Sequence, residues 1–264
     1  MEKQLNVVGT RVPMLDAAQK AKGAALFTDD LVLPGMLHGR ILRSPVPHAR
    51  IRHIDTSRAE QLPGVKGVVT GRDIPDRRYG IVPKAKDEHA LARDKVRYIG
   101  DDVAAVCAVD PETAEEALAL ITVEYEALPA VFDPLEAKKE GAPVIHEGVQ
   151  NNTSFFIRKE FGDVARAFGE CDDIFEHSFY SQAVNHAPLE PHAAVAEFDS
   201  NGCLTVWSST QKPFFVSWDL ALALGLPESK VRVIKPEVGG GFGGKLETAS
   251  NDFCAAFLAR KTGR

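Results

Sequence analysis

The sequence predicts an α+β protein in two parts, and three observations indicate this. An apolar strand, a helix and a second strand follow one another over residues 102–132. A polar, proline-containing stretch over 134–160 has the character of a linker. Beyond it, short strands are interspersed with helices. With 264 residues, of which 44% are hydrophobic and 26% charged, the chain is long enough for one large or two small globular domains. We place the boundary near residue 147, which gives parts 1–147 and 148–264.

The strand–helix–strand unit is the clearest local pattern in the first part. Residues 102–109 form a continuous apolar run, typical of a strand that is buried on both faces. Asp110 and Pro111 have the character of an N-cap and a first-turn proline, and the helix-favouring residues 112–120 follow them. Residues 121–125 alternate as a strand. We expect the two strands to pair in parallel through a right-handed crossover.

The remaining elements follow from turn residues and periodicity. In the first part we expect a short helix from Asp55 that ends before Pro63, and strands over 36–42, 51–54 and 65–70. In the second part we expect helices over 162–168, 213–224 (stopped by Gly225) and 246–260, and strands over 174–180, 193–198, 203–208 and 231–234.

Composition excludes several classes of function. The net charge of −6 argues against a general nucleic-acid surface, which needs clustered lysine and arginine. No apolar run reaches the length of a membrane span, and Met1 to Leu5 lack the apolar core of an export signal. The four cysteines, Cys107, Cys171, Cys203 and Cys254, stand far apart, so we expect neither an iron–sulfur cluster nor a zinc site within this chain. Scattered thiols suit a reducing cytoplasm.

The glycine run from Val238 to Lys245 is the most unusual segment. It lies between a predicted strand and a predicted helix, and its uncovered backbone allows a ligand to approach closely. A mobile or tightly turning loop is the plain alternative. Gly239, Gly241 and Gly244 fit a dinucleotide-binding pattern, but the required acidic residue would fall beyond residue 264. A phosphate-binding loop would need serine or threonine where Leu246 stands.

The segment Gly239-Gly-Gly-Phe-Gly-Gly-Lys245 resembles a loop of the xanthine oxidase and aldehyde oxidase family of molybdenum hydroxylases. Ser208-Ser-Thr-Gln-Lys-Pro213 is similar to the family's S-T-Q-x-P segment at the family spacing, and Asn185 to His192 resembles its M-E-P strand entry. Residues 36–45, 48–51, 96–106 and 121–126 resemble the family's a/b hammerhead domain. The resemblance covers almost all of the chain, in order. It therefore implies a hammerhead domain followed by the start of a molybdopterin-binding domain, in the N-terminal portion of the large subunit.

This resemblance also implies a set of site residues. Gln211 would lie close to the metal's oxo group, and as a neutral carboxamide it can donate a hydrogen bond there. Gly240, Gly241, Phe242 and Gly243 would lie beside the molybdopterin cofactor, with Phe242 also at the substrate. The family's metal takes its ligands from the pterin, so the protein contributes no metal ligand.

Three further residues are candidates near that site. Glu190 could be a buried carboxylate near the substrate or a structural group at the strand edge. Lys245 could meet an anionic cofactor or cap a helix. Purine-oxidising members carry glutamate where Leu246 stands, and Glu247, one helical step later, should point elsewhere. We therefore expect a substrate less polar than xanthine, such as an N-heteroaromatic, an aldehyde or an aromatic thioester.

The resemblance finally implies dependence on partners. The family's general base and most of its pterin contacts would come from a chain that carries the C-terminal half of the molybdenum domain. Iron–sulfur clusters, and FAD if present, would belong to further subunits. We expect an oxidoreductase subunit that is inactive alone. The alternative is a non-catalytic assembly or structural subunit of such a complex.

Overall fold

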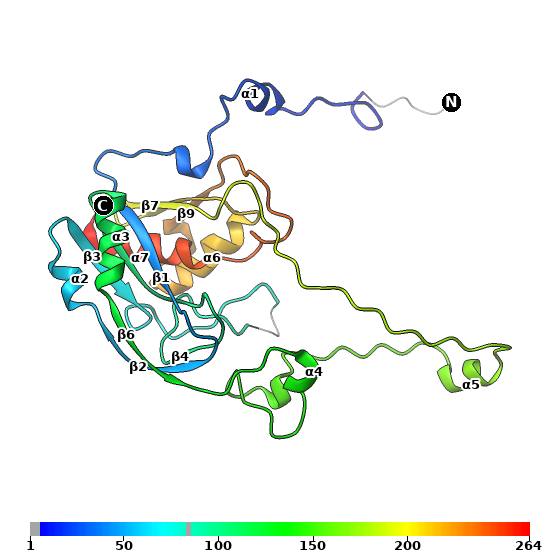
Figure 1. Cartoon of the computed structure of the whole chain (residues 1–264). Helices are drawn as coiled ribbons and strands as arrows, with labels where there is room; N and C mark the ends of the chain where they lie inside the picture. The colour runs from blue at the N-terminus through cyan, green and yellow to red at the C-terminus, as the bar shows by residue number, and fades with distance from the viewer. Residues whose placement is uncertain (1–5, 83–85) are drawn as a thin grey trace.

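The computed structural model describes residues 6–82 and 86–264, and it contains three small β-sheets, with helices packed against the first and the third (Figure 1). Met1 to Leu5, from which we expected no export signal, lie outside the described residues. Five of the six strand pairings are antiparallel, and the helices lie against the sheets rather than alternating regularly with parallel strands. The predicted α+β class is therefore confirmed.

The first sheet has β5 at its centre. Its strands are β1 (His38–Arg43), β3 (Val65–Thr70) and β5 (Asp102–Ala108), in the order β1-β5-β3. Every residue of β5 after Asp102 is buried, because β1 and β3 occupy both edges of the strand and other elements cover both faces. The expected double-sided burial of this apolar run is confirmed for residues 103–108, whereas Val109 is exposed.

The second sheet corrects one prediction. It has the order β4-β2-β6, with β2 (Ala49–Asp55), β4 (Lys95–Val96) and β6 (Thr122–Ala127). The expected parallel pairing of β5 with β6 is wrong, because both edges of β5 are taken by β1 and β3, and β6 pairs antiparallel with β2 instead. The alternating burial of β6 fits a strand with one solvated face.

Two short helices complete this half. In α3 (Pro111–Leu120) the Asp110 carboxylate accepts a hydrogen bond from the Thr113 amide at 2.7 Å, as the sequence predicts for an N-cap before a proline. The predicted helix after Asp55 is α2 (Ser57–Gln61), and it ends before Pro63.

The third sheet and two helices form the second half. The strands β7 (Ala194–Phe198), β8 (Leu204–Ser208) and β9 (Val231–Ile234) have the order β7-β8-β9. Helix α6 (Pro213–Leu224) ends at Gly225, whose φ of 66° is the left-handed conformation expected of a glycine stop. The last helix, α7 (Ser250–Thr262), begins four residues later than predicted. Thr248 precedes it and donates its hydroxyl hydrogen bond to Asp219 of α6 at 2.7 Å, and the Ala249 amide is capped by Asp252 at 3.1 Å.

The two halves share one core. The main buried cluster combines Val69 and Cys107 of the first sheet with Leu204 of β8, Leu220 of α6 and Phe257 of α7. Helix α7 contacts strands of the first and third sheets, so it joins the two halves. The boundary near residue 147 stays a prediction.

The chain between the halves has two distinct stretches. The first carries α4 (Pro134–Ala137) and η2 (Gln150–Asn152) and is held to β4, since Lys95 and Arg97 both contact Glu147, at 2.8 and 3.0 Å. From 153 to 187 every residue is exposed, and this arm, with α5 (Val164–Gly169), projects away from the body (Figure 1). The strand expected over 174–180 is wrong, because that segment lies on the arm and does not pair with any described strand. The other short elements are α1 (Ala17–Ala21), η1 (Thr28–Asp30) and η3 (Glu228–Lys230).

The carboxyl groups of Glu88 and Glu247 interact near the glycine loop and link the two halves. Glu88 forms a backbone bridge with Tyr79, and the Ile81 amide donates to Glu247, the second residue after Lys245, at 3.2 Å. Burial, together with the charge of Glu247 and a hydrogen bond to it, raises the pKa of Glu88 from 4.5 to about 7. The folded chain therefore keeps a proton that the unfolded chain loses at lower pH.

We predict a pH-dependent stability effect for Glu88→Gln. Between pH 4.5 and 7 the folded state holds a proton on Glu88 that the unfolded state has lost. The free energy of unfolding of the parent therefore falls as the pH rises from 4.5 towards 7, and this contribution is fully present only below pH 4.5. The neutral amide removes this loss. The melting temperature of the variant relative to the parent should therefore rise between pH 4.5 and 7 and level off above it. Exposed Glu124 on β6 supplies the control, Glu124→Gln. Parallel stability profiles for Glu88→Gln and the parent would contradict the prediction.

Candidate active site

The glycine loop, residues 238–245, connects β9 to the bend before α7 and runs against two other segments. A Cβ atom at Gly241 would lie 2.5 Å from Oε1 of Gln211, and one at Gly239 would lie 2.6 Å from Cβ of Glu190. Real Cβ atoms do not approach so closely, so a side chain at Gly239 would clash with the base of Glu190, and a side chain at Gly241 would displace the Gln211 carboxamide. The structure thus brings together three segments that we singled out in the sequence.

Gln211 is fixed by the loop. Its Oε1 accepts hydrogen bonds from the backbone amides of Gly243, at 3.2 Å, and Lys245, at 3.3 Å. The backbone amide of Gln211 donates in turn to the Lys245 carbonyl at 2.8 Å. Because Oε1 faces two N–H donors, the carboxamide orientation is determined. Its NH₂ group makes no hydrogen bond to any residue in the described part of the chain, and the side chain is exposed. Gln211 can therefore donate to a bound molecule.

Glu190 and Lys245 form a buried ion pair. The Lys245 side chain is fully buried, and its Nζ lies 2.7 Å from Oε2 of Glu190, whose side chain is 9% exposed. The same carboxylate oxygen accepts the Gly239 amide at 2.8 Å. Of the two roles considered for Lys245, a helix cap is excluded, since α7 begins only at Ser250.

The middle of the loop is strained and open. Phe242 has a φ of 51°, rare for a residue other than glycine, and its side chain is 74% exposed. It lies between Gly240 and Gly243, with φ values of 98° and 92°. Within residues 6–82 and 86–264, the amides of Gly240, Gly241 and Phe242 have no hydrogen-bond partner. Three successive donors are thus unpaired, and two of them belong to residues that are at least partly exposed, Gly240 and Phe242, where a ligand can reach them.

Leu246 and Glu247 follow the loop in a bend, not in a helix. The prediction that Leu246 and Glu247 lie one step apart on a helix is therefore wrong. Glu247 is nevertheless directed away by the Ile81 amide, which donates to it at 3.2 Å. Leu246 lies next to the loop, because its Cδ1 would be 3.9 Å from a Cβ atom at Gly243.

His186 and His192 of the strand entry do not belong to a metal centre within the part of the chain that the structure describes. Among the described residues, no group of three His, Cys, Asp or Glu side chains has the geometry to hold a metal ion. The His186 ring packs against Gly244, where a Cβ atom would lie 3.0 Å from it. Burial, and then the charge of Lys245, lowers the pKa of His192.

The Glu190–Lys245 pair is the site feature that sequence reasoning did not identify. Its signal was present, since a lysine that is to be buried needs a carboxylate partner. Which carboxylate would serve could not be read from two residues 55 positions apart.

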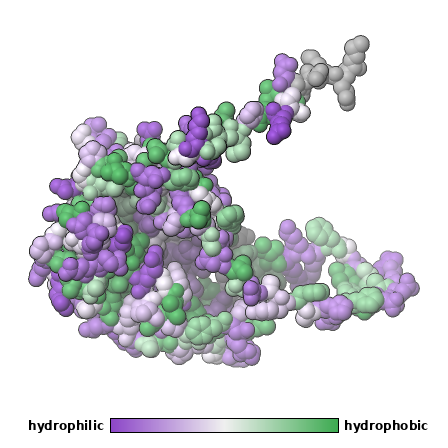
Figure 2. All heavy atoms as spheres, turned by 45° about the horizontal axis from the view of Figure 1, so that its top comes forward, coloured by the Kyte–Doolittle hydropathy of each residue, from purple (hydrophilic) through white to green (hydrophobic). Residues whose placement is uncertain are grey.

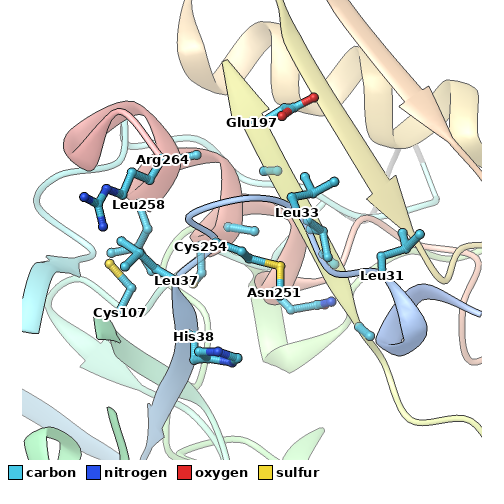
Figure 3. Close-up of a pocket in the computed structure, with 18 of the residues that line it drawn as sticks. Leu31, Leu33, Leu37, His38, Cys107, Glu197, Asn251, Cys254, Leu258 and Arg264 are labelled. Atoms are coloured by element: carbon cyan, nitrogen blue, oxygen red, sulfur yellow. The ribbon is translucent and has the colours of Figure 1, made fainter. Parts of the chain in front are cut away.

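A cavity of about 620 Å³ lies elsewhere, between the segment before β1, strand β7 and helix α7 (Figure 3). Leu33, Leu37 and Leu258 are among its apolar lining residues, and Arg264 and Glu197 lie at its polar edges. It contains none of the predicted site residues, so we do not assign the site to it.

Comparison with protein families gives two matches. Residues 22–129 match the model of the aldehyde oxidase and xanthine dehydrogenase a/b hammerhead domain, and residues 145–264 match that of the molybdopterin cofactor-binding domain. Among the described helices, none combines the length and the hydrophobicity of a membrane span.

Individual relatives agree with these models. The chain is 41% identical to the nicotinate dehydrogenase large molybdopterin subunit of Eubacterium barkeri, over 97% of this chain and 59% of that protein. Quinoline 2-oxidoreductase from Pseudomonas putida 86 superposes with a TM-score of 0.85 at 34% identity, over 97% of this chain and 34% of that one. CO dehydrogenase from Oligotropha carboxidovorans also superposes with a TM-score of 0.85 at 34% identity, over 97% of this chain and 34% of that one.

The chain thus spans between a third and three fifths of the length of these relatives. The two matched models follow each other in the order that the sequence predicts, with hammerhead first. The chain belongs to the xanthine oxidase and aldehyde oxidase family of molybdenum hydroxylases and corresponds to the N-terminal portion of their molybdopterin-binding large subunit.

Proposed function

We propose that this chain forms part of the molybdenum site of a hydroxylase that oxidises an N-heteroaromatic compound, with an aldehyde or an aromatic thioester as the other substrate classes. The observation that carries the proposal is the joint placement of Gln211 and the glycine loop, with unused donors on both. When bound, the molybdopterin cofactor would supply the two-electron redox centre for the oxidation.

The residues present fit such a cofactor. The free amides of Gly240, Gly241 and Phe242 offer donors to an acceptor-rich group, and the NH₂ group of Gln211 offers another from across the loop. Gln211 and the loop residues 240–243 would therefore hold the cofactor, and fixed donors of this kind stabilise charge without reorganising.

Phe242 and Leu246 would shape the substrate side. Phe242 presents an exposed ring, held by a strained backbone, on which a planar substrate can stack. Leu246 cannot accept a hydrogen bond from a polar ring, so a purine would find no partner there. Relatives named for nicotinate and quinoline oxidation support the N-heteroaromatic class.

The exposed arm supports dependence on partner chains. Residues 153–187 are exposed throughout, and the space-filling view shows hydrophobic atoms along this arm (Figure 2). Its exposed aromatic side chains are Phe155, Phe156, Phe161, Phe168, Phe175, Phe179 and Tyr180. So much apolar surface on an extended segment calls for a covering protein surface. We propose that a chain with the C-terminal half of the molybdenum domain covers it and completes the site.

Electron transfer would need further subunits. We propose that a separate iron–sulfur subunit, with or without a flavin subunit, carries the electrons away. The four cysteines in this chain are free thiols at scattered positions, two of them buried in the core. Free thiols of this kind suit the cytoplasm, where we place the complex.

The isolated chain should bind little molybdopterin and show no turnover, because partner chains would supply the rest of the cofactor site. Purification from the native source, with molybdenum analysis and identification of the co-purifying chains, checks this. We expect about one molybdenum per complex and none in the separated chain. Full activity from the purified 264-residue chain would contradict the dependence on partners.

Gln211→Ala should lower turnover of the assembled complex by about 10²–10³-fold, the effect typical of losing one preorganised donor. Because the Gln211 side chain is exposed, the melting temperature of the Gln211→Ala variant should differ little from that of the parent. Gln150→Ala, on η2, provides a control for a glutamine lost from outside the site. Equal kinetics for Gln211→Ala and the parent would remove Gln211 from the site.

The substrate class predicts a kinetic order. The complex should oxidise nicotinate or a related N-heteroaromatic with a higher kcat/KM than xanthine, and Phe242→Ala should weaken aromatic substrates more than small aldehydes. Steady-state kinetics on the assembled complex measure both. Preferred oxidation of xanthine would show that Leu246 does not set the substrate class.

A further inference from the structure

Lys245 holds an uncommon position for a lysine, since its side chain is fully buried and its ammonium meets Glu190 at 2.7 Å. A buried pair of this kind contributes little net stability, because removing both charges from water offsets their attraction. Apolar residues of similar volume would often stabilise a core as well or better. A role other than stability therefore has to account for the pair.

The contacts of the pair indicate that role. Oε2 of Glu190 accepts from the amide of Gly239, at the start of the loop, as well as from Nζ of Lys245, at its end. The backbone of Glu190 adds a second bond, its amide donating to the Gly239 carbonyl at 3.1 Å. One carboxylate thus joins both ends of the glycine loop.

The backbone of Lys245 extends the same connection to Gln211. Its amide donates to Oε1 of Gln211, and its carbonyl accepts from the Gln211 amide at 2.8 Å and from the Thr210 hydroxyl at 3.3 Å. The position of Lys245 consequently sets where the Gln211 carboxamide points. Between the fixed ends, the positive φ of Phe242 persists, and strain of this kind survives only where the surroundings over-determine it.

We propose that Lys245 and Glu190 are positioning residues: their buried ion pair fixes both ends of the glycine loop and thereby aligns the Gln211 carboxamide with the strained Phe242 segment. Its catalytic meaning rests on the proposed function. The positional claim concerns this chain alone and can be tested without cofactor or partners.

Amide hydrogen exchange on the full chain measures the claim. The test variant is the double substitution Glu190→Met and Lys245→Met, which removes both charges at similar volume and leaves no unpaired buried charge. The Gly239 amide loses its acceptor directly, so the diagnostic amide is that of Gly243, whose partner Gln211 is unchanged. We expect exchange at Gly243 to rise by about tenfold, as for the loss of one hydrogen bond, while core amides of α6 and α7 stay as protected as in the parent.

A second pair in the chain gives the control. Lys95 is also buried, but its ammonium contacts Glu147 at 2.8 Å and the Val144 carbonyl at 2.9 Å, and no residue of the glycine loop. Lys95→Met with Glu147→Met should leave exchange at Gly243 unchanged. Glu190→Asp provides a second test that does not require the double variant to fold, because it keeps the charge and withdraws the carboxylate by one methylene. It too should raise exchange at Gly243.

Unchanged protection at Gly243 in Glu190→Asp, or loosening there that only equals the loss of protection in the core, would overturn the proposal. In the assembled complex the double variant should lower kcat on the order of 10²-fold, as misplacement of a catalytic group does, with KM nearly unchanged. If loop exchange rises as expected while the parent complex shows no oxidation of any proposed substrate, the positional claim stands and the proposed function fails.

Discussion

A buried ammonium and a buried carboxylate hold the functional end of this protein together. Lys245 and Glu190 lie 55 positions apart in the chain, yet their side chains meet at 2.7 Å beneath the glycine loop. Once both are removed from water, neither can be released without leaving the other unpaired, which is far more costly than keeping the pair. The three segments that carry them and Gln211 therefore adopt one common arrangement.

That arrangement depends on a scaffold shared between the two halves. Strand β8 leads into Gln211, and β9 leads into the glycine loop. Because the two strands are parallel and end at the same edge of the third sheet, these two segments lie next to each other. Helix α7 follows the loop and packs against strands of both the first and third sheets. The apolar cluster that includes Val69, Leu204 and Phe257 thus fixes the position of the loop from below.

The site is rigid where the chain supports it and open where a ligand would lie. A side chain at Gly239 would meet Cβ of Glu190 at 2.6 Å, and one at Gly241 would displace the carboxamide of Gln211. Three amides at the top of the loop remain without partners among the described residues, and Phe242 is exposed on a strained backbone. Free donors and strain at one place are what a binding site requires and what a purely structural loop would avoid.

Local patterns in the sequence determined most elements of the fold. The continuous apolar run of β5, the Asp110 cap of α3 and the Gly225 stop of α6 each follow from neighbouring residues, and so they could be predicted. The resemblance of the glycine loop and the Gln211 segment to a known family likewise lay in short, contiguous motifs. What a strand pairs with is different, because it depends on which edges remain free after distant segments have packed. The sequence therefore could not exclude pairing of β5 with β6, nor show that residues 174–180 lack a partner strand. For the same reason only the tertiary structure chose Glu190 as the partner of Lys245, since a buried charge selects whichever opposite charge the packed chain brings within reach.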